Sequence, residues 1–188
     1  MKKFLLPLAL AILATVDTES CDPSTIALAE EGLDKMNEIM TNGSSYEYGD
    51  CTLVIRDNAD VISDTEEQKI VNNLAHLCST SKCDILLMTT NEMGLSSLSP
   101  GVTYAQMYLP EDSENWICLT YDFKRAQYSI YYDGDIATSA CGGSQSDAIL
   151  NAGAHHFKHD EYAEGLEAMA EKCLQNLAKK SGSSKSLP

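Results

Sequence analysis

The feature that most constrains the fold is a strand–helix–strand succession in the first half of the chain. Residues 51–55 have high β propensity, and residues 84–88 form a nearly continuous apolar run, typical of a strand buried on both faces. Between these runs, Ser63 and Glu66 have the spacing of a capping box, which opens a helix. A strand, a helix and a strand in this order predict a right-handed parallel crossover, and therefore an α/β fold.

Two further strands are expected to complete the sheet. They are Trp116–Thr120 and Gln127–Tyr132, and the short connection between them suits an antiparallel hairpin. Further helices are expected around residues 104–108, from about Ser146, and after Asp160, which is predicted to cap the last helix. Together these elements predict an αβα sandwich, with a mixed sheet of about four strands flanked by helices.

The first twenty residues resemble an export signal. Lys2 and Lys3 precede an apolar run, Phe4–Val16, that is shorter than the roughly 20 residues of a membrane-spanning helix. We therefore interpret residues 1–20 as a signal peptide and expect a secreted or cell-envelope protein. Cys21 is an alternative site of lipid attachment, which would be the only tie of the protein to a membrane.

The 188 residues suit one domain with short flanking elements. Residues 21–50 are interpreted as an amphipathic helix followed by a linker at 41–50, residues 51–178 as the domain, and residues 179–188 as a disordered tail. The apolar stripe of the amphipathic helix consists of Ile26, Ala29, Leu33, Met36 and Met40. This helix either docks a partner or packs on its own domain.

The charge of the chain narrows its choice of partners. The chain has 28 acidic and 13 basic residues and a formal net charge of −15. Such a surface repels phosphate backbones, which argues against nucleic-acid binding, and it is equally unsuited to anionic lipids. Clustered carboxylates suit divalent cations. Solubility alone accounts for the same excess of acids.

Export would permit disulfides among the seven cysteines. The spacing is not that of a small disulfide scaffold, and no C-x-x-C motif is present. Cys78 and Cys83, which flank a predicted turn, are the best candidate pair. Cys118 and Cys173 are interpreted as core thiols because they lie within a strand-like run and an apolar helix stripe.

Three stretches resemble the TPM domain family, which includes thylakoid-lumen phosphatases, photosystem II repair proteins and nematode receptor modulators. The stretches read VIRDNADVIS followed by Glu66 and Glu67, then WICLTYDFKR, and finally FKHDEYAEGL. They span about residues 51–178 in the order found in the family. The chain departs from the family pattern at His159, where a glycine is usual, and lacks the typical G-x-G-L-E after Tyr132.

The resemblance implies an αβα sandwich, a divalent cation held near acidic side chains and, in some members, phosphatase activity. The residues themselves indicate where such a cation would lie, because ligands of open α/β sheets sit beyond the carboxyl ends of parallel strands. The predicted metal ligands at these ends are Asp57, Asn58, Glu92 and Asp122, with Thr89, Thr90 and Asn91 beside them.

Hard oxygen ligands of this kind favour Ca²⁺, with Mg²⁺ or Mn²⁺ as alternatives. The competing interpretation is structural: Asp57 would be an Asx cap and Asp122 a turn residue. Arg125 is a candidate for bidentate anion binding, and it could equally pair with Asp122.

Signals for other chemistry are weak. His155, His156 and His159 form the only histidine cluster and are interpreted as a pH-sensitive surface patch. No G-x-S-x-G motif is present, so nucleophilic catalysis has little support.

The sequence therefore predicts an exported, monomeric TPM-like domain that binds a divalent cation. It would serve as an accessory module for an envelope or membrane protein complex. The alternative is a metal-assisted acid phosphatase acting on phosphomonoesters, in which the cation polarises a phosphoryl oxygen and activates water.

Overall fold

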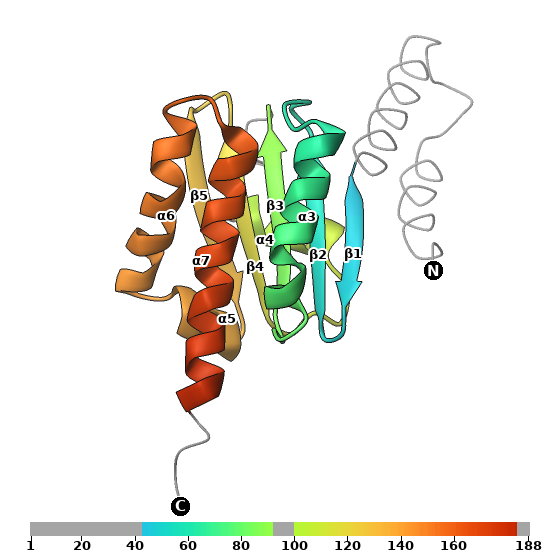
Figure 1. The fold of residues 1–188 in the computed structure, drawn as a ribbon, viewed down its shortest axis with the longest axis vertical. Helices are drawn as coiled ribbons and strands as arrows, with labels where there is room; N and C mark the ends of the chain where they lie inside the picture. Colours follow the sequence, from blue (N-terminus) through green and yellow to red (C-terminus); the bar gives the residue numbers. More distant parts are fainter. Residues whose placement is uncertain (1–42, 92–99, 184–188) are drawn as a thin grey trace, which may run out of the picture. The chain divides into compact units, whose positions relative to one another are not determined.

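The computed structural model describes residues 43–91 and 100–183, and within them a five-stranded sheet forms the middle layer (Figure 1). Its strands are β1 (Ser44–Tyr48), β2 (Cys51–Asp57), β3 (Asp84–Thr90), β4 (Trp116–Asp122) and β5 (Gln127–Asp133). They lie in the order β1-β2-β3-β4-β5, with β2, β3 and β4 parallel and the two edge strands antiparallel to their neighbours. The parallel crossover and the hairpin predicted from the sequence are both confirmed.

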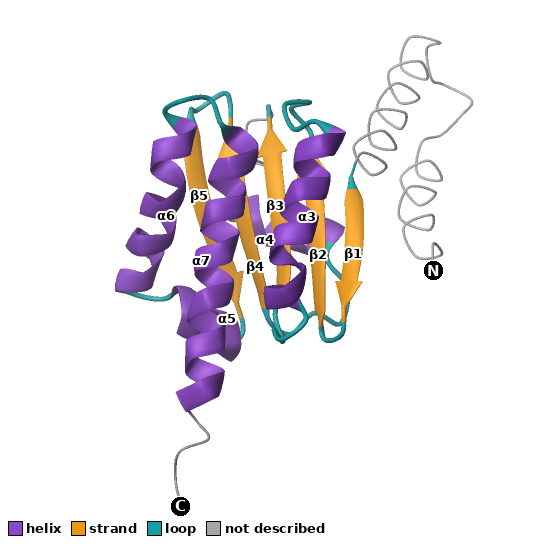
Figure 2. Ribbon diagram, in the orientation of Figure 1, coloured by secondary structure: helices purple, strands orange, loops and turns teal. Residues whose placement is uncertain are grey.

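Helices cover both faces of this sheet (Figure 2). One face carries α3 (Asp64–Cys78), α5 (Asp135–Cys141), α6 (Ser144–Phe157) and α7 (Tyr162–Ser183). The other face carries α4 (Pro100–Tyr108). The αβα sandwich is confirmed, with one strand more than expected.

Alternation along the central strands divides the core into two parts. Ile55, Leu87 and Leu119 point toward α3 and α7, whereas Leu86 and Cys118 point toward α4. Because both faces of β3 are covered, its residues from Ile85 onward are all buried. This explains why the strand appears in the sequence as a continuous apolar run.

The capping box at the start of α3 is formed as predicted. The backbone N–H of Ser63 donates to Glu66 Oε2 at 2.8 Å, and the Ser63 hydroxyl accepts from the backbone N–H of Glu66 at 3.4 Å. The capping box fixes where the helix begins, immediately after the loop that follows β2.

The structure differs from the sequence interpretation at three places. The linker expected at 41–50 contains β1, a short strand whose residues alternate between half-buried and exposed. Helix α5 was not expected, because its seven residues are too few to show a period. The last helix begins at Tyr162 rather than next to Asp160, whose φ of 60° places it in a left-handed turn.

That last helix also continues to Ser183, into the segment expected to be a tail. The predictions for residues 1–42, including the signal peptide, Cys21 and the amphipathic helix, lie outside the described residues, as do residues 184–188. Among the helices described, none combines the length and apolarity needed to cross a bilayer.

Candidate functional site

The parallel strands β2, β3 and β4 have their carboxyl ends at the same edge of the sheet. In the strand registers Asp57 lies opposite Thr89, and Asp122 lies opposite Thr90. Two backbone hydrogen bonds extend the ladders past the strand ends, from Asn58 N–H to Thr89 O at 3.2 Å and from Phe123 N–H to Thr90 O at 2.9 Å. The structure therefore brings Asp57, Asn58 and Asp122 to the same edge, while Glu92 lies outside the described residues.

The Asp57 carboxylate organises the loop that follows β2. Its Oδ2 accepts the backbone N–H groups of Val61 and Ile62, both at 2.7 Å, and its Oδ1 accepts the hydroxyl of Thr89. These contacts are those of an Asx cap, as the structural interpretation of Asp57 predicted. A carboxylate has about four acceptor positions, and these three contacts leave one of them, on Oδ1, for a cation.

Asn58, the next residue, is held differently. Its side-chain Oδ1 is buried and accepts no hydrogen bond from the residues that the structure describes. Leaving a buried amide oxygen without a partner costs about 1–3 kcal/mol. Amide and carboxylate oxygens are both among the ligands that Ca²⁺ takes in proteins.

Asp122 forms the turn between β4 and β5. Its Oδ1 accepts the backbone N–H of Arg125 at 3.2 Å, and its Oδ2 lies 3.7 Å from Arg125 Nε. The Asp122 side chain is 15% exposed and that of Arg125 is 47% exposed. The pairing that the sequence left open for Arg125 is thus present.

The registers also separate the two aspartates. Asp57 shares a face with Thr89 and Asp122 shares a face with Thr90, and these threonines are neighbours on β3. Because neighbouring residues of a strand point to opposite faces, Asp57 points to the side of α3 and α7 and Asp122 to the side of α4. A cation held by both carboxylates would have to lie beyond the edge itself.

A small cavity of about 50 Å³ lies on the α4 side of this edge. Its lining is mostly polar and consists of Thr90, Tyr104, Thr120, Asp122, Arg125, Gln127, Ser129 and Tyr131. This volume holds an ion or a few water molecules, whereas small-molecule sites usually need roughly 300 Å³ or more.

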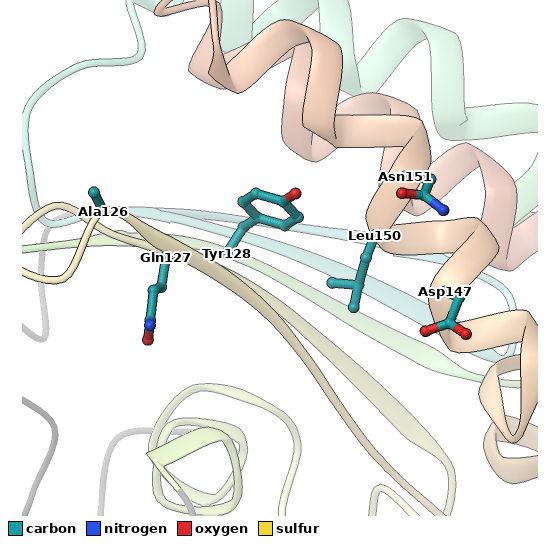
Figure 3. Close-up of a pocket in the computed structure, with 6 residues that line it drawn as sticks. All are labelled: Ala126, Gln127, Tyr128, Asp147, Leu150 and Asn151. Atoms are coloured by element: carbon teal, nitrogen blue, oxygen red, sulfur yellow. The ribbon is translucent and has the colours of Figure 1, made fainter.

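A larger and more open groove of about 560 Å³ lies between β5 and α6 (Figure 3). Ala126, Gln127 and Tyr128 line it from the strand. From α6 it is lined by Asp147, Leu150 and Asn151, and Figure 3 shows Leu150 reaching toward the strand. A single carboxylate, Asp147, makes up the acidic part of this lining, so the groove is a less suitable cation site than the strand ends.

An aromatic cluster supports the edge from the side of α7, and sequence reasoning missed it. The rings of Tyr121, Phe123, Phe157 and Tyr162 pack with centroid distances of 4.6–4.9 Å. The Tyr162 hydroxyl donates to Asp160 Oδ1 at 2.7 Å, and this bond raises the pKa of Tyr162 to about 12. The FKHDEYAEGL stretch therefore packs α6 and α7 against the sheet. The aromatic residues at the end of β4 are the sequence signal from which this cluster could have been predicted.

The histidines lie at the end of α6 and in the following turn. The rings of His155 and His159 are 4.7 Å apart, and His156 Nδ1 lies 2.8 Å from Glu161 Oε2. This contact with His156 holds the pKa of Glu161 below its usual range. Within residues 43–91 and 100–183, no group of three or more His, Cys, Asp or Glu side chains is arranged to hold a metal ion.

Comparison with known proteins decides the family. The TPM domain family matches residues 55–176, which is more than half of the chain. The chain belongs to the TPM domain family. The identification made from the three sequence stretches is confirmed, and the TPM domain contains every described residue of the strand-end site.

Two solved structures have a similar fold. The first is the N-terminal domain of a protein from P. gingivalis, with 18% identity and a TM-score of 0.56, covering 67% of this chain and 82% of that one. The second is the BA42 protein from the psychrophilic bacterium Bizionia argentinensis, with 17% identity and a TM-score of 0.53, covering 64% and 83%. At these identities the likeness concerns the fold alone. A search of curated proteins gave no match.

Proposed function

We propose that this TPM domain binds a divalent cation, Ca²⁺ in the first place, at the carboxyl edge of its sheet. The observation that carries the proposal is the buried Oδ1 of Asn58, which lacks a hydrogen-bond partner among the described residues. A cation would supply the missing partner. The domain would act as an accessory module of an envelope or membrane protein complex, exported by its N-terminal segment.

The predicted ligands differ in whether they must first give up an existing contact in order to bind a cation. Asn58 Oδ1 and the one free acceptor position of Asp57, on its Oδ1, can bind a cation without breaking a contact. Asp122 would first have to exchange Arg125 for the cation. Glu92, which follows β3 in the sequence and lies outside the described residues, is the predicted ligand that would complete the site.

A cation-binding module fits this edge better than a phosphatase. The cavity of about 50 Å³ beside Asp122, which neither Asp57 nor Asn58 lines, is too small for a phosphomonoester. Arg125, the predicted anion ligand, already pairs with Asp122. A net charge of −15 also repels phosphate esters from the whole surface.

Calorimetric titration of Ca²⁺ into the chelator-treated full chain tests the proposal. We expect saturable binding to one site, and the Asn58→Ala variant should bind at least about tenfold more weakly, a loss of about 1.4 kcal/mol. The same variant without metal should be as stable as the wild type or more so, because it removes a desolvated oxygen that has no partner. Asn58→Asp, which adds a charge at the same position, should retain binding.

Asp50→Asn is the matched control, since Asp50 is an exposed acid in the turn at the opposite end of β2. It removes one negative charge and should leave the affinity unchanged. Equal weakening by Asn58→Ala and Asp50→Asn would mean that Ca²⁺ senses only the diffuse surface charge, and the proposed site would be wrong.

A phosphatase assay with the bound metal forms the second arm of the experiment. The accessory-module proposal expects no turnover of a generic phosphomonoester. Turnover that disappears in Asn58→Ala would favour the metal-assisted phosphatase instead.

A further inference from the structure

Five buried thiols gather on one face of the sheet. Cys51, Cys78, Cys83, Cys141 and Cys173 all belong to the core beneath α3 and α7, and each is at most 1% exposed. Cys118 is the sixth cysteine of the described residues and lies alone in the core beneath α4. All six are free thiols in the structure.

Two of these thiols are in direct contact across the fold. The sulfur of Cys141, the last residue of α5, lies 3.9 Å from the sulfur of Cys173 in α7. Both side chains are completely buried. A disulfide has a sulfur separation of about 2.0 Å, so the two sulfurs, which already touch, would have to approach further to form the bond.

We propose that Cys141 and Cys173 form a disulfide in the exported protein, which ties α5 to α7. The two thiols lose two protons and two electrons as the S–S bond forms. A disulfide-carrying oxidant, such as oxidised glutathione or a thiol–disulfide oxidoreductase, accepts the electrons and is released as two thiols.

The reaction belongs to folding rather than to the finished domain. Contact with Cys141 and burial both raise the pKa of Cys173, so little thiolate exists in the folded core. Since the thiolate is the attacking species, the mixed disulfide with the oxidant forms while the thiols are still accessible. The disulfide then becomes buried when α7 packs against α5.

Three further thiols, Cys51, Cys78 and Cys83, lie in the same part of the core. Cys51 begins β2 and Cys78 ends α3, the helix that packs on that strand. Cys78 and Cys83 are free thiols in the structure, and the pair that the sequence suggested for them stays a prediction.

Peptide mapping tests the pairing directly. The full chain is unfolded, reduced, refolded in a glutathione redox buffer, alkylated and digested with trypsin. Cleavage after Lys158 and Lys172 separates Cys141 from Cys173. We expect a linked peptide pair carrying Cys141 and Cys173, and alkylated Cys118.

Complete alkylation of Cys141 and Cys173 would overturn the proposal, as would a dominant bond from either of them to Cys83. Cys173→Ser should free Cys141 for alkylation, and Cys118→Ser, the matched control, should leave the linked pair in place. A measurement on the wild type guards against a variant that fails to fold. Reduction should lower its melting temperature by roughly 10 °C, and an unchanged melting temperature would contradict the proposal.

Discussion

Asp57 and Asn58 are adjacent at the end of β2, yet their side chains are satisfied to different degrees. Asp57 accepts two backbone N–H groups and one hydroxyl, whereas Asn58 Oδ1 is buried with no partner among the described residues. The sequence predicted both as ligands and left the Asx cap open as the alternative for Asp57. It could not show that Asn58 is desolvated, because that depends on how the capped loop folds over it.

Gly165 is a second residue whose role becomes clear from its surroundings. It lies in α7 against the ring of Phe157, and a Cβ at Gly165 would lie 2.3 Å from Phe157 Cε1. We expect Gly165→Ala to lower the free energy of unfolding by about 1–3 kcal/mol through overpacking, although alanine is the better helix former. Urea unfolding of the metal-free protein measures this change.

The Phe157→Leu background provides the control for this prediction. A smaller side chain leaves room for the new methyl group, so Gly165→Ala should cost less there than in the wild type. An equal cost in both backgrounds would mean that the contact with the ring is not what excludes alanine.

At the scale of elements, helix α3 owes its start to a capping box that contains a titratable group. Hydrogen bonds from the Ser63 hydroxyl and from its backbone N–H hold the pKa of Glu66 below its usual range. The folded-state pKa is therefore lower than the unfolded one, near 4.3. The stabilisation by this carboxylate is present above the unfolded pKa and is lost as the pH falls through the folded value.

Glu66→Gln isolates this contribution, because glutamine can accept the same bonds without titrating. We expect the wild type to exceed the variant in free energy of unfolding at pH 7 and to lose that advantage at pH 3. Urea titrations of both proteins at the two pH values measure the difference, in which the other carboxylates cancel. A difference that does not change with pH would contradict the assignment.

Elements differ in how far the sequence could predict them. The capping box, the apolar run of β3 and the short β4–β5 connection are local signals, and the elements that they predicted are present. Strand β1 has no such signal, because its polar residues become a strand only by pairing with β2. Helix α5 is short and follows Gly134, whose φ is 87°, so its seven residues carry no helical period that a sequence could show.

At the scale of the whole molecule, the parallel order of β2, β3 and β4 brings the predicted acids to one edge. The sequence supported this convergence through the order of its elements. Which face each acid occupies depends on the strand registers, which no local pattern specifies. Asp57 and Asp122 consequently lie at the same edge but point to opposite faces.

The domain thus has two chemically different ends. The proposed cation site lies at the carboxyl ends of the parallel strands, whereas Cys51 and Cys83 lie at their amino ends, beneath the face that also carries Cys141 and Cys173. The seven residues of β2 separate these ends by about 20 Å. Sites so far apart with no shared partner usually contribute independently to the free energy.

We therefore expect that reducing the proposed Cys141–Cys173 disulfide lowers the melting temperature without changing the affinity for Ca²⁺. Calorimetric titration of the oxidised and the reduced protein, both confirmed as folded by circular dichroism, should give binding free energies that agree within about 0.5 kcal/mol. Asn58→Ala should, in turn, lower the affinity in both redox states and leave the fall in melting temperature on reduction unaltered. Helix α7 contributes both Cys173, which contacts Cys141, and Tyr162, which belongs to the aromatic cluster. A loss of Ca²⁺ affinity on reduction alone would therefore mean that α7 couples the two thiols to the carboxyl ends of the strands, and the expected independence would be wrong.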